Sequence, residues 1–200
     1  MRRAALVLAV AAAVLAGCAG GGGGASVSAS RIDALVLKDE DVGRLFSLFD
    51  EGRQIAPDFT PLRSELRRFG RQDGWKARFR RRGSRTTKGP LVVESKADLF
   101  EERSGAEDDL EAYRAEFDER VQAGRGSARL VAAPLVGDES VGLRTVQIGT
   151  PAVRFYTIAW RQHNVTASVS VNGFRLTMDD AVALARKQER RIERAADESS

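Results

Sequence analysis

The short connections between the strand-like segments of this chain constrain its fold more than any other feature. Gln162, His163 and Asn164 alone separate the strand-like segments 153–161 and 165–171. Two parallel strands need a crossover of a dozen or more residues between them, whereas two antiparallel strands can be joined by a tight turn. The sequence therefore predicts an antiparallel sheet.

The strands themselves are marked by alternation of apolar and polar residues. Trp75, Ala77 and Phe79 alternate with basic residues, and the same period of two recurs over 91–96. This period is typical of half-buried strands, so the two segments predict a hairpin whose polar loop is 83–90. Further strand-like segments lie at 130–136, 141–148, 153–161 and 165–171.

Helical periodicity appears before, between and after these strands. Short helices are expected after Asp39 and after Thr60, and long amphipathic helices over 106–122 and after Thr177. Asp180 lies three residues after Thr177, as in a capping box. Strand groups that are followed by helices predict an α+β domain. We expect an antiparallel sheet of five to six strands with the amphipathic helices packed on one face.

The first eighteen residues have the organisation of a bacterial export signal. A cationic start precedes the apolar stretch 4–16, which at about 1.5 Å per residue is too short to cross a hydrocarbon core of roughly 30 Å. The stretch ends in Leu15-Ala16-Gly17-Cys18, which resembles the lipobox of bacterial lipoproteins. The resemblance implies cleavage before Cys18, a diacylglyceryl group on its thiol, and acyl chains such as palmitate. The alternative is an ordinary secretory signal that contains a cysteine by chance.

Three parts of the chain are therefore expected. Residues 1–17 form the lipoprotein signal peptide, residues 18–30 the lipidated Cys18 with a glycine- and serine-rich tether, and residues 31–200 a single globular α+β domain. Two acyl chains suffice for stable anchoring. We expect the mature protein to be extracytoplasmic, on the cell membrane or, in a two-membrane bacterium, on the outer membrane. The membrane is thus one expected partner.

The net charge indicates no class of soluble partner. The 32 basic residues, less Arg2 and Arg3 of the signal peptide, leave 30 against 28 acidic residues, a formal charge of +2. Nucleic acid is not expected as a partner outside the cell, although the segment 63–88 is locally basic.

One strand of this basic segment is a candidate binding surface. If residues alternate between the two faces, four cations share the face opposite Trp75 and Phe79, namely Lys76, Arg78, Arg80 and Arg82. Such a face could bind an anionic lipid headgroup or a cell-wall polymer. The alternative is a solvated edge whose cations prevent edge-to-edge aggregation.

Residues suited to catalysis or metal binding are few. A single Cys and a single His exclude a disulfide framework and a metal cluster built on Cys or His. His163 lies in a predicted turn, and the segment 137–142 lacks the spacing of a Gly-x-Ser-x-Gly nucleophile motif. We therefore expect no catalytic residues, metal or cofactor.

Several short motifs in the second part of the chain carry a family resemblance. They are Gly74-Trp75, Ser95 with Phe100, Val136-Gly137-Asp138-Glu139-Ser140, Trp160-Arg161 with Asn164, and Ala185 with Gln188. Over about residues 70–195 the chain is similar to a loose group of uncharacterised bacterial lipoproteins and to the extracellular sensor domain of mycobacterial PknH-type kinases. The resemblance implies an antiparallel sheet with helices and a ligand-binding cleft. It assigns no functional residue, and the kinase group has disulfides that this chain lacks.

Together these features predict a lipid-anchored, non-enzymatic binding or sensing module of the bacterial cell envelope. Its ligand surface is expected either in a cleft between helices and sheet or on the basic hairpin. One alternative is an assembly or accessory protein that docks to an envelope protein through apolar surface. The other is an envelope hydrolase in which His163 meets a hydroxyl and a carboxylate.

Overall fold

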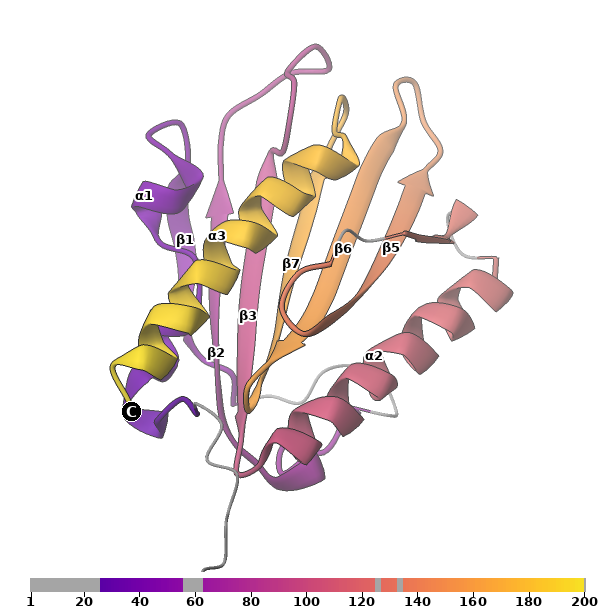
Figure 1. Cartoon of the computed structure of the whole chain (residues 1–200). Helices are drawn as coiled ribbons and strands as arrows, with labels where there is room; N and C mark the ends of the chain where they lie inside the picture. Colours follow the sequence, from indigo (N-terminus) through magenta and orange to yellow (C-terminus); the bar gives the residue numbers. More distant parts are fainter. Residues whose placement is uncertain (1–25, 56–62, 125–126, 133–134, 200) are drawn as a thin grey trace, which may run out of the picture.

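The computed structural model describes residues 26–55, 63–124, 127–132 and 135–199. Its strands form one sheet in the order β1-β2-β3-β7-β6-β5-β4, in which every neighbouring pair is antiparallel (Figure 1). The strands are β1 Ser47–Arg53, β2 Arg71–Arg80, β3 Val92–Phe100, β4 Arg129–Val131, β5 Glu139–Gln147, β6 Val153–Gln162 and β7 Val165–Gly173. The antiparallel pairing agrees with the short connections in the sequence.

Two long helices follow the two central strands. The helix α2 (Arg103–Gln122) comes after β3, and α3 (Met178–Asp197) comes after β7. The predicted capping box of α3 is present, because the Thr177 hydroxyl accepts from the Asp180 N–H and the Asp180 carboxylate accepts from the Thr177 N–H. The shorter elements are α1 (Asp39–Val42) and the 3₁₀ helices η1 (Ala29–Leu35) and η3 (Arg68–Gly70).

The expectation of five to six strands is wrong, because the sheet has seven. The additional strand is β1, in a segment whose apolar spacing predicts a helix. The helix α1 stops after four residues at Gly43, which adopts a φ of 89°, and the chain then extends along β2. Leu48 and Phe49 stay 40% and 44% exposed on this edge strand, so the segment lacks the alternation that identifies half-buried strands.

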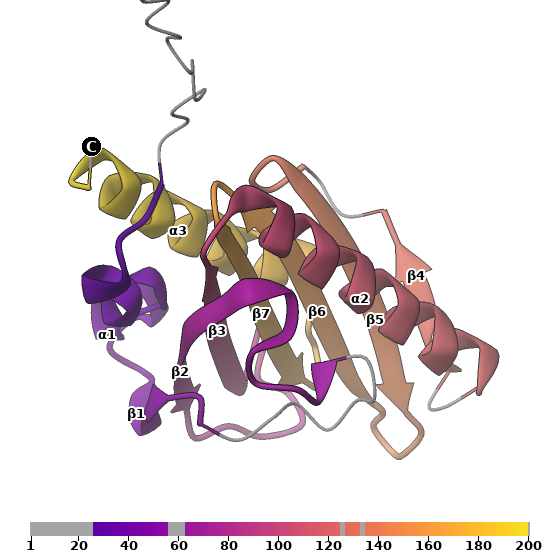
Figure 2. The same ribbon diagram turned by 90° about the horizontal axis from the view of Figure 1, so that it is seen from below.

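The expectation that the helices share one face of the sheet is also wrong. On one face, α3 packs through residues such as Ala185 and Ile192 against Val93 and Val169 in the main core. A second core contains Leu110 and Phe117 of α2 with Val141, Leu143 and Ala159. Since neighbouring residues of a strand point to opposite faces, the two helices cover opposite faces of the sheet (Figures 1 and 2).

The polar face of strand β7 explains why the sequence predicts helices on one face only. The polar positions of β7 alternate with apolar ones and suggest a solvated face. They are Thr166, Ser168 and Ser170. In the structure α2 covers them, and Thr166 donates to the Ala106 carbonyl of that helix. A polar face of a strand can thus lie beneath a helix when its hydroxyls have partners.

The first described residues enter the core directly. Val27 is 4% exposed, and its N–H donates to Asn164 Oδ1 over 2.8 Å. The packed part of the chain thus includes residues of the segment 18–30 that was expected to be a tether. The signal peptide and Cys18 lie outside the described residues. Among the described residues, no helix combines the length and apolar character that crossing a bilayer requires.

The helix expected after Thr60 lies partly outside the described residues, which resume at Arg63. Between Arg63 and Gly70 the structure has turns and the short 3₁₀ helix η3.

Candidate binding cleft between helix α2 and the sheet

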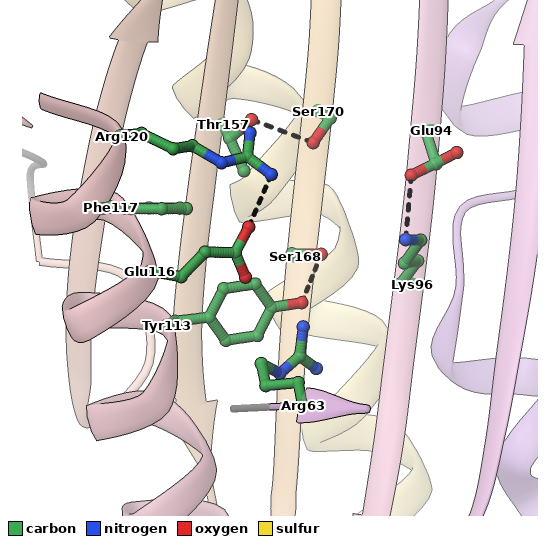
Figure 3. Close-up of a pocket in the computed structure, with 10 residues that line it drawn as sticks. All are labelled: Arg63, Glu94, Lys96, Tyr113, Glu116, Phe117, Arg120, Thr157, Ser168 and Ser170. Carbon is green, nitrogen blue, oxygen red and sulfur yellow. Dashed lines mark hydrogen bonds and ion pairs between the residues drawn. The ribbon is translucent and has the colours of Figure 1, made fainter. Parts of the chain in front are cut away.

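A cleft of about 240 Å³ lies between α2 and the sheet (Figure 3). The helix contributes four residues from one face, at the spacing i, i+3, i+4 and i+7. They are Tyr113, Glu116, Phe117 and Arg120. The sheet contributes residues from three adjacent strands, which are Glu94, Lys96, Thr157, Ser168 and Ser170. Arg63 completes the lining.

Hydroxyl groups form the floor of the cleft. The Tyr113 hydroxyl donates to Ser168 Oγ over 3.2 Å, and the hydroxyls of Thr157 and Ser170 share a hydrogen bond of 3.0 Å. Each hydroxyl can both donate and accept. The floor can therefore exchange hydrogen bonds with a polar ligand in either direction.

Four of the five charged groups of the lining form ion pairs with one another. Glu116 and Arg120 form an ion pair of 2.5 Å on α2, and Glu94 and Lys96 one of 3.2 Å on β3 (Figure 3). The Arg63 guanidinium lies 3.6 Å from the centroid of the Tyr113 ring, a cation–π contact. A lining with internally balanced charge favours a ligand that is neutral or carries balanced charges itself.

A buried ionic network supports the cleft from below. Arg63 donates to Asp98 (2.9 Å) and to Asp109 (3.0 Å). Arg68 bonds the same two carboxylates at 3.0 and 2.7 Å, and Arg71 adds a bond of 2.7 Å to Asp98. All five side chains are buried. Because Asp98 belongs to β3 and Asp109 to α2, the network fixes the helix to the sheet.

Gly74 of the Gly74-Trp75 motif is required by this network. A Cβ at this position would lie 1.9 Å from Arg71 Nη2 and 2.4 Å from Asp98 Oδ1. Glycine is thus the residue that allows the Arg71–Asp98 pair to lie against β2.

Other motif residues of the family resemblance also have structural roles. On the α3 face, the Ser95 hydroxyl donates to Gln188 Oε1 over 2.7 Å and accepts from the Leu37 N–H. Gly137 adopts a φ of 63°, and a Cβ there would lie 2.4 Å from the Arg161 carbonyl oxygen. These residues position the elements and do not line the cleft.

The expected anionic-ligand face is divided between two environments. Lys76 lies 2.9 Å from Asp50, and Arg78 pairs with Glu94 at 2.5 Å. Hydrogen bonding from Lys76 lowers the pKa of Asp50, and the nearby charges of Lys76 and Arg78 lower it further. This part of the face carries its own counter-charges.

The other two residues of that face lie towards the hairpin loop. The Arg80 guanidinium lies 5.3 Å from the Phe49 ring centroid, and Arg82 is exposed beyond the end of β2. Binding of an anion to Lys76, Arg78, Arg80 and Arg82 stays a prediction.

His163 and the adjacent carboxylates Asp138 and Glu139 lie outside the cleft. His163 occupies the turn between β6 and β7, with Nε2 3.4 Å from Glu193. Asp138 pairs with Arg103 and Arg161, and Glu139 pairs with Arg114 and Arg161. These carboxylates belong to a surface ion-pair network.

A cleft between helices and sheet was one of the two expected ligand surfaces, but its lining residues do not follow from the sequence when both helices are expected on the same face. Tyr113 and Phe117 belong to the second core as well as to the cleft, and Arg63 lies in the segment 63–88, whose basic composition gives no sign that this side chain is buried. The available signal was the row of hydroxyls at alternate positions of β7. A row of this kind is compatible with a polar interface beneath a helix as well as with a solvated face.

Comparisons with known proteins show a similarity in structure. No family model matches the chain, and no curated protein matches it. Among solved structures, the chain is similar to the crystal structure of the extracellular domain of PknH from Mycobacterium tuberculosis, with a TM-score of 0.62 and 13% identity. The match covers 84% of this chain and 98% of that domain. At this identity the likeness shows the fold, and it confirms the PknH-type resemblance at that level.

Proposed function

We propose that this protein is a lipid-anchored, extracytoplasmic binding module whose cleft beneath α2 holds one small polar ligand. The observation that carries the proposal is the convergence of four hydroxyls with internally paired charges in one concave site. The cleft is smaller than the roughly 300–1,000 Å³ typical of pockets for drug-sized ligands. A single sugar ring, which is uncharged and bears several hydroxyls, has the chemistry that this lining complements.

The proposed location has support from two independent sources. The lipobox Leu15-Ala16-Gly17-Cys18 supports acylation and export, and the similar PknH domain is described as extracellular. A Cys18→Ser variant tests the anchor directly. We expect it to lose incorporation of labelled palmitate and to lose firm membrane association. Equal membrane association without any label on the wild type would contradict the proposal.

A non-catalytic role is the simplest one for this site. His163, the sole histidine of the chain, does not line this cleft, and the two carboxylates that do, Glu94 and Glu116, form ion pairs with Lys96 and Arg120. The hydroxyls of the cleft are bonded to one another. Activation of a hydroxyl nucleophile requires an adjacent general base.

An NMR titration of the full-length protein tests the cleft with N-acetylglucosamine as the probe. We expect amide shifts to be concentrated in α2, β6 and β7 around Tyr113, Thr157 and Ser170. Ser170→Ala should weaken binding about tenfold, because a ligand hydroxyl would lose its partner in a partly buried site. Ser104→Ala removes an exposed hydroxyl at the start of the same helix and should leave the affinity unchanged.

Two results would contradict the cleft as the site. One is the absence of saturable shifts with the probe. The other is a set of shifts outside α2 and the adjoining strands that Ser170→Ala does not alter.

A further inference from the structure

A second cavity of about 560 Å³ lies at the end of the sheet opposite the first described residues. Three connections meet there: the β2–β3 loop, the β5–β6 connection and the β7–α3 connection (Figure 1). Four cationic side chains line the cavity, three from the connections and one from strand β6, namely Arg85, Lys88, Arg175 and Arg154. We infer that this cavity binds an anion that bears phosphate groups.

The charge of the cavity is not balanced by the described residues around it. None of the four cations forms an ion pair with a carboxylate of the described chain, and Arg154 donates to the Leu176 carbonyl. Asp180 is the one acidic residue of the lining, and its carboxylate accepts hydrogen bonds from the Thr177 N–H and hydroxyl. Cations gathered around a concavity create a positive potential that attracts anions.

The cavity is built by contacts between segments that are distant in sequence. The Gly89 N–H donates to the Arg175 carbonyl over 3.1 Å, and the Leu91 N–H donates to the Asn172 carbonyl over 2.7 Å. A Cβ at Gly173 would lie 2.7 Å from the Gly89 carbonyl oxygen, so glycine permits this close approach. The β2–β3 loop is thus held against the end of β7, and its cations have a defined position.

The residue types favour phosphate over other anions. Three of the four cations are arginines, whose planar guanidinium presents paired donors that match phosphate oxygens. Four positive charges against one carboxylate suit a ligand with several negative charges. Phe174 and Pro151 form an apolar part of the lining, which suits a phosphate ester with an organic portion.

The position of the cavity distinguishes two sources of phosphate, if the proposed lipid anchor is present. Strand β7 has nine residues and spans about 27 Å, and Val27 lies at its start beside Asn164. Cys18 precedes Val27 by nine positions in the sequence, so the proposed anchor would attach at this end of the sheet. The cavity would therefore face away from the anchoring membrane, which favours a soluble or polymeric phosphate over headgroups of that membrane.

Calorimetric titration of the full-length protein in non-ionic detergent, with tripolyphosphate as the probe, tests the site. The titration is done at about 0.15 M salt, at which exposed charges more than about 8 Å apart are largely screened, so that only cations near the bound anion affect its affinity. We expect Arg154→Gln with Arg175→Gln to weaken binding at least about tenfold. The control, Arg190→Gln with Arg194→Gln, removes the same charge from the exposed face of α3 towards its other end. It should change the affinity less than about twofold.

A second pair of substitutions distinguishes loss of the binding site from misfolding of the first variant. Arg85→Gln with Lys88→Gln alters exposed side chains of a loop and should also weaken binding at least about fivefold. Equal losses in the control and in both cavity variants would overturn the site, as would failure of tripolyphosphate to bind. Ser170→Ala should not affect this binding, so failure of the cleft proposal and failure of this one are distinguishable.

Reconstituted vesicles separate the two phosphate sources. The wild-type protein is placed in phosphatidylcholine vesicles with or without phosphatidylglycerol, and tripolyphosphate affinity is measured in each. We expect the two affinities to agree within about twofold. A large loss of affinity in phosphatidylglycerol vesicles would show competition by headgroups and would overturn the assignment to a phosphate outside the membrane.

Discussion

The two faces of the sheet are covered by helices of equal length but are built from different chemistry. Beneath α3 the strands present apolar side chains, such as Phe79, Val93, Ile158 and Trp160. Beneath α2 the strands present both apolar side chains, such as Val141 and Leu143, and polar ones, such as Ser168 and Asp98. The α3 face thus supplies mainly hydrophobic stabilisation, whereas the α2 face combines an apolar core with a polar site.

The energetic rules of the two faces differ accordingly. Burial of apolar area is non-directional, so the α3 face depends on volume and packing. Buried ions are stable only with their partners in place, so the α2 face depends on particular hydrogen bonds. Substitutions on the two faces should therefore differ in what they cost and in whether they alter binding.

The largest loss of stability is expected for Asp109→Ala on the α2 face. The substitution leaves Arg63 and Arg68 buried without one of their carboxylates. Removal of one partner of a buried ion pair typically costs about 3–5 kcal/mol. Urea unfolding should show this loss, whereas Asp108→Ala, an exposed neighbour on the same helix, should change the free energy of unfolding by under about 0.5 kcal/mol. A small loss for Asp109→Ala would mean that the network does not fix α2 to the sheet.

The next effect is expected on the α3 face, for Ile192→Ala. Ile192 is fully buried in the main core, and truncation of such a side chain typically costs about 2–5 kcal/mol. We expect a loss of about 3 kcal/mol in urea unfolding. Affinity for N-acetylglucosamine should not change under conditions in which the variant is folded. A change in affinity without a change in stability would contradict the division between the faces.

Tyr113→Phe should separate binding from stability on the α2 face. The substitution removes the hydroxyl that donates to Ser168 and keeps the ring that Arg63 contacts. A neutral hydrogen bond contributes about 1 kcal/mol to stability, so unfolding should change little. Binding of N-acetylglucosamine should weaken more, in the same titration, because the hydroxyl faces the cleft. Phe117→Leu alters the neighbouring ring without removing a polar group and provides the comparison.

Much of the fold followed from local patterns in the sequence. The short turn at 162–164, the alternation in β2 and the capping box at Thr177 each act over a few residues, and each has the predicted structure. The strand β1 and the placement of α2 did not follow. An exposed edge strand has no buried alternation, and the face that a helix covers depends on contacts between distant segments.

The residues that line the candidate site do not follow from the sequence, for the same reason. Arg63, Arg68 and Arg71 have the composition of a solvated basic segment, and only their contacts with Asp98 and Asp109 show that they are internal. The carboxylates lie 27 or more residues away in sequence. A single sequence contains no signal for such pairing, whereas the hydroxyl row of β7 was present and could have been used.

The smallest loss of stability is expected for an ion pair at the exposed edge of the α2 face. Asp50 accepts from Lys76, which lowers the pKa of its carboxyl below the ordinary value of 3.8. A lowered pKa in the folded state means that the ion pair contributes fully to stability above the ordinary pKa, and that this contribution is lost as the pH falls through the folded-state pKa.

The Asp50 side chain is 36% exposed, so solvent screens the pair and its contribution to stability should be under about 1 kcal/mol. Asp50→Asn should thus destabilise slightly at neutral pH, with a difference from wild type in urea unfolding that shrinks as the pH falls below the ordinary value of 3.8. Asp118→Asn, on the exposed side of α2, should show no such trend. A loss at Asp50 as large as that at Asp109 would show that pairing, rather than burial, decides the cost on this face.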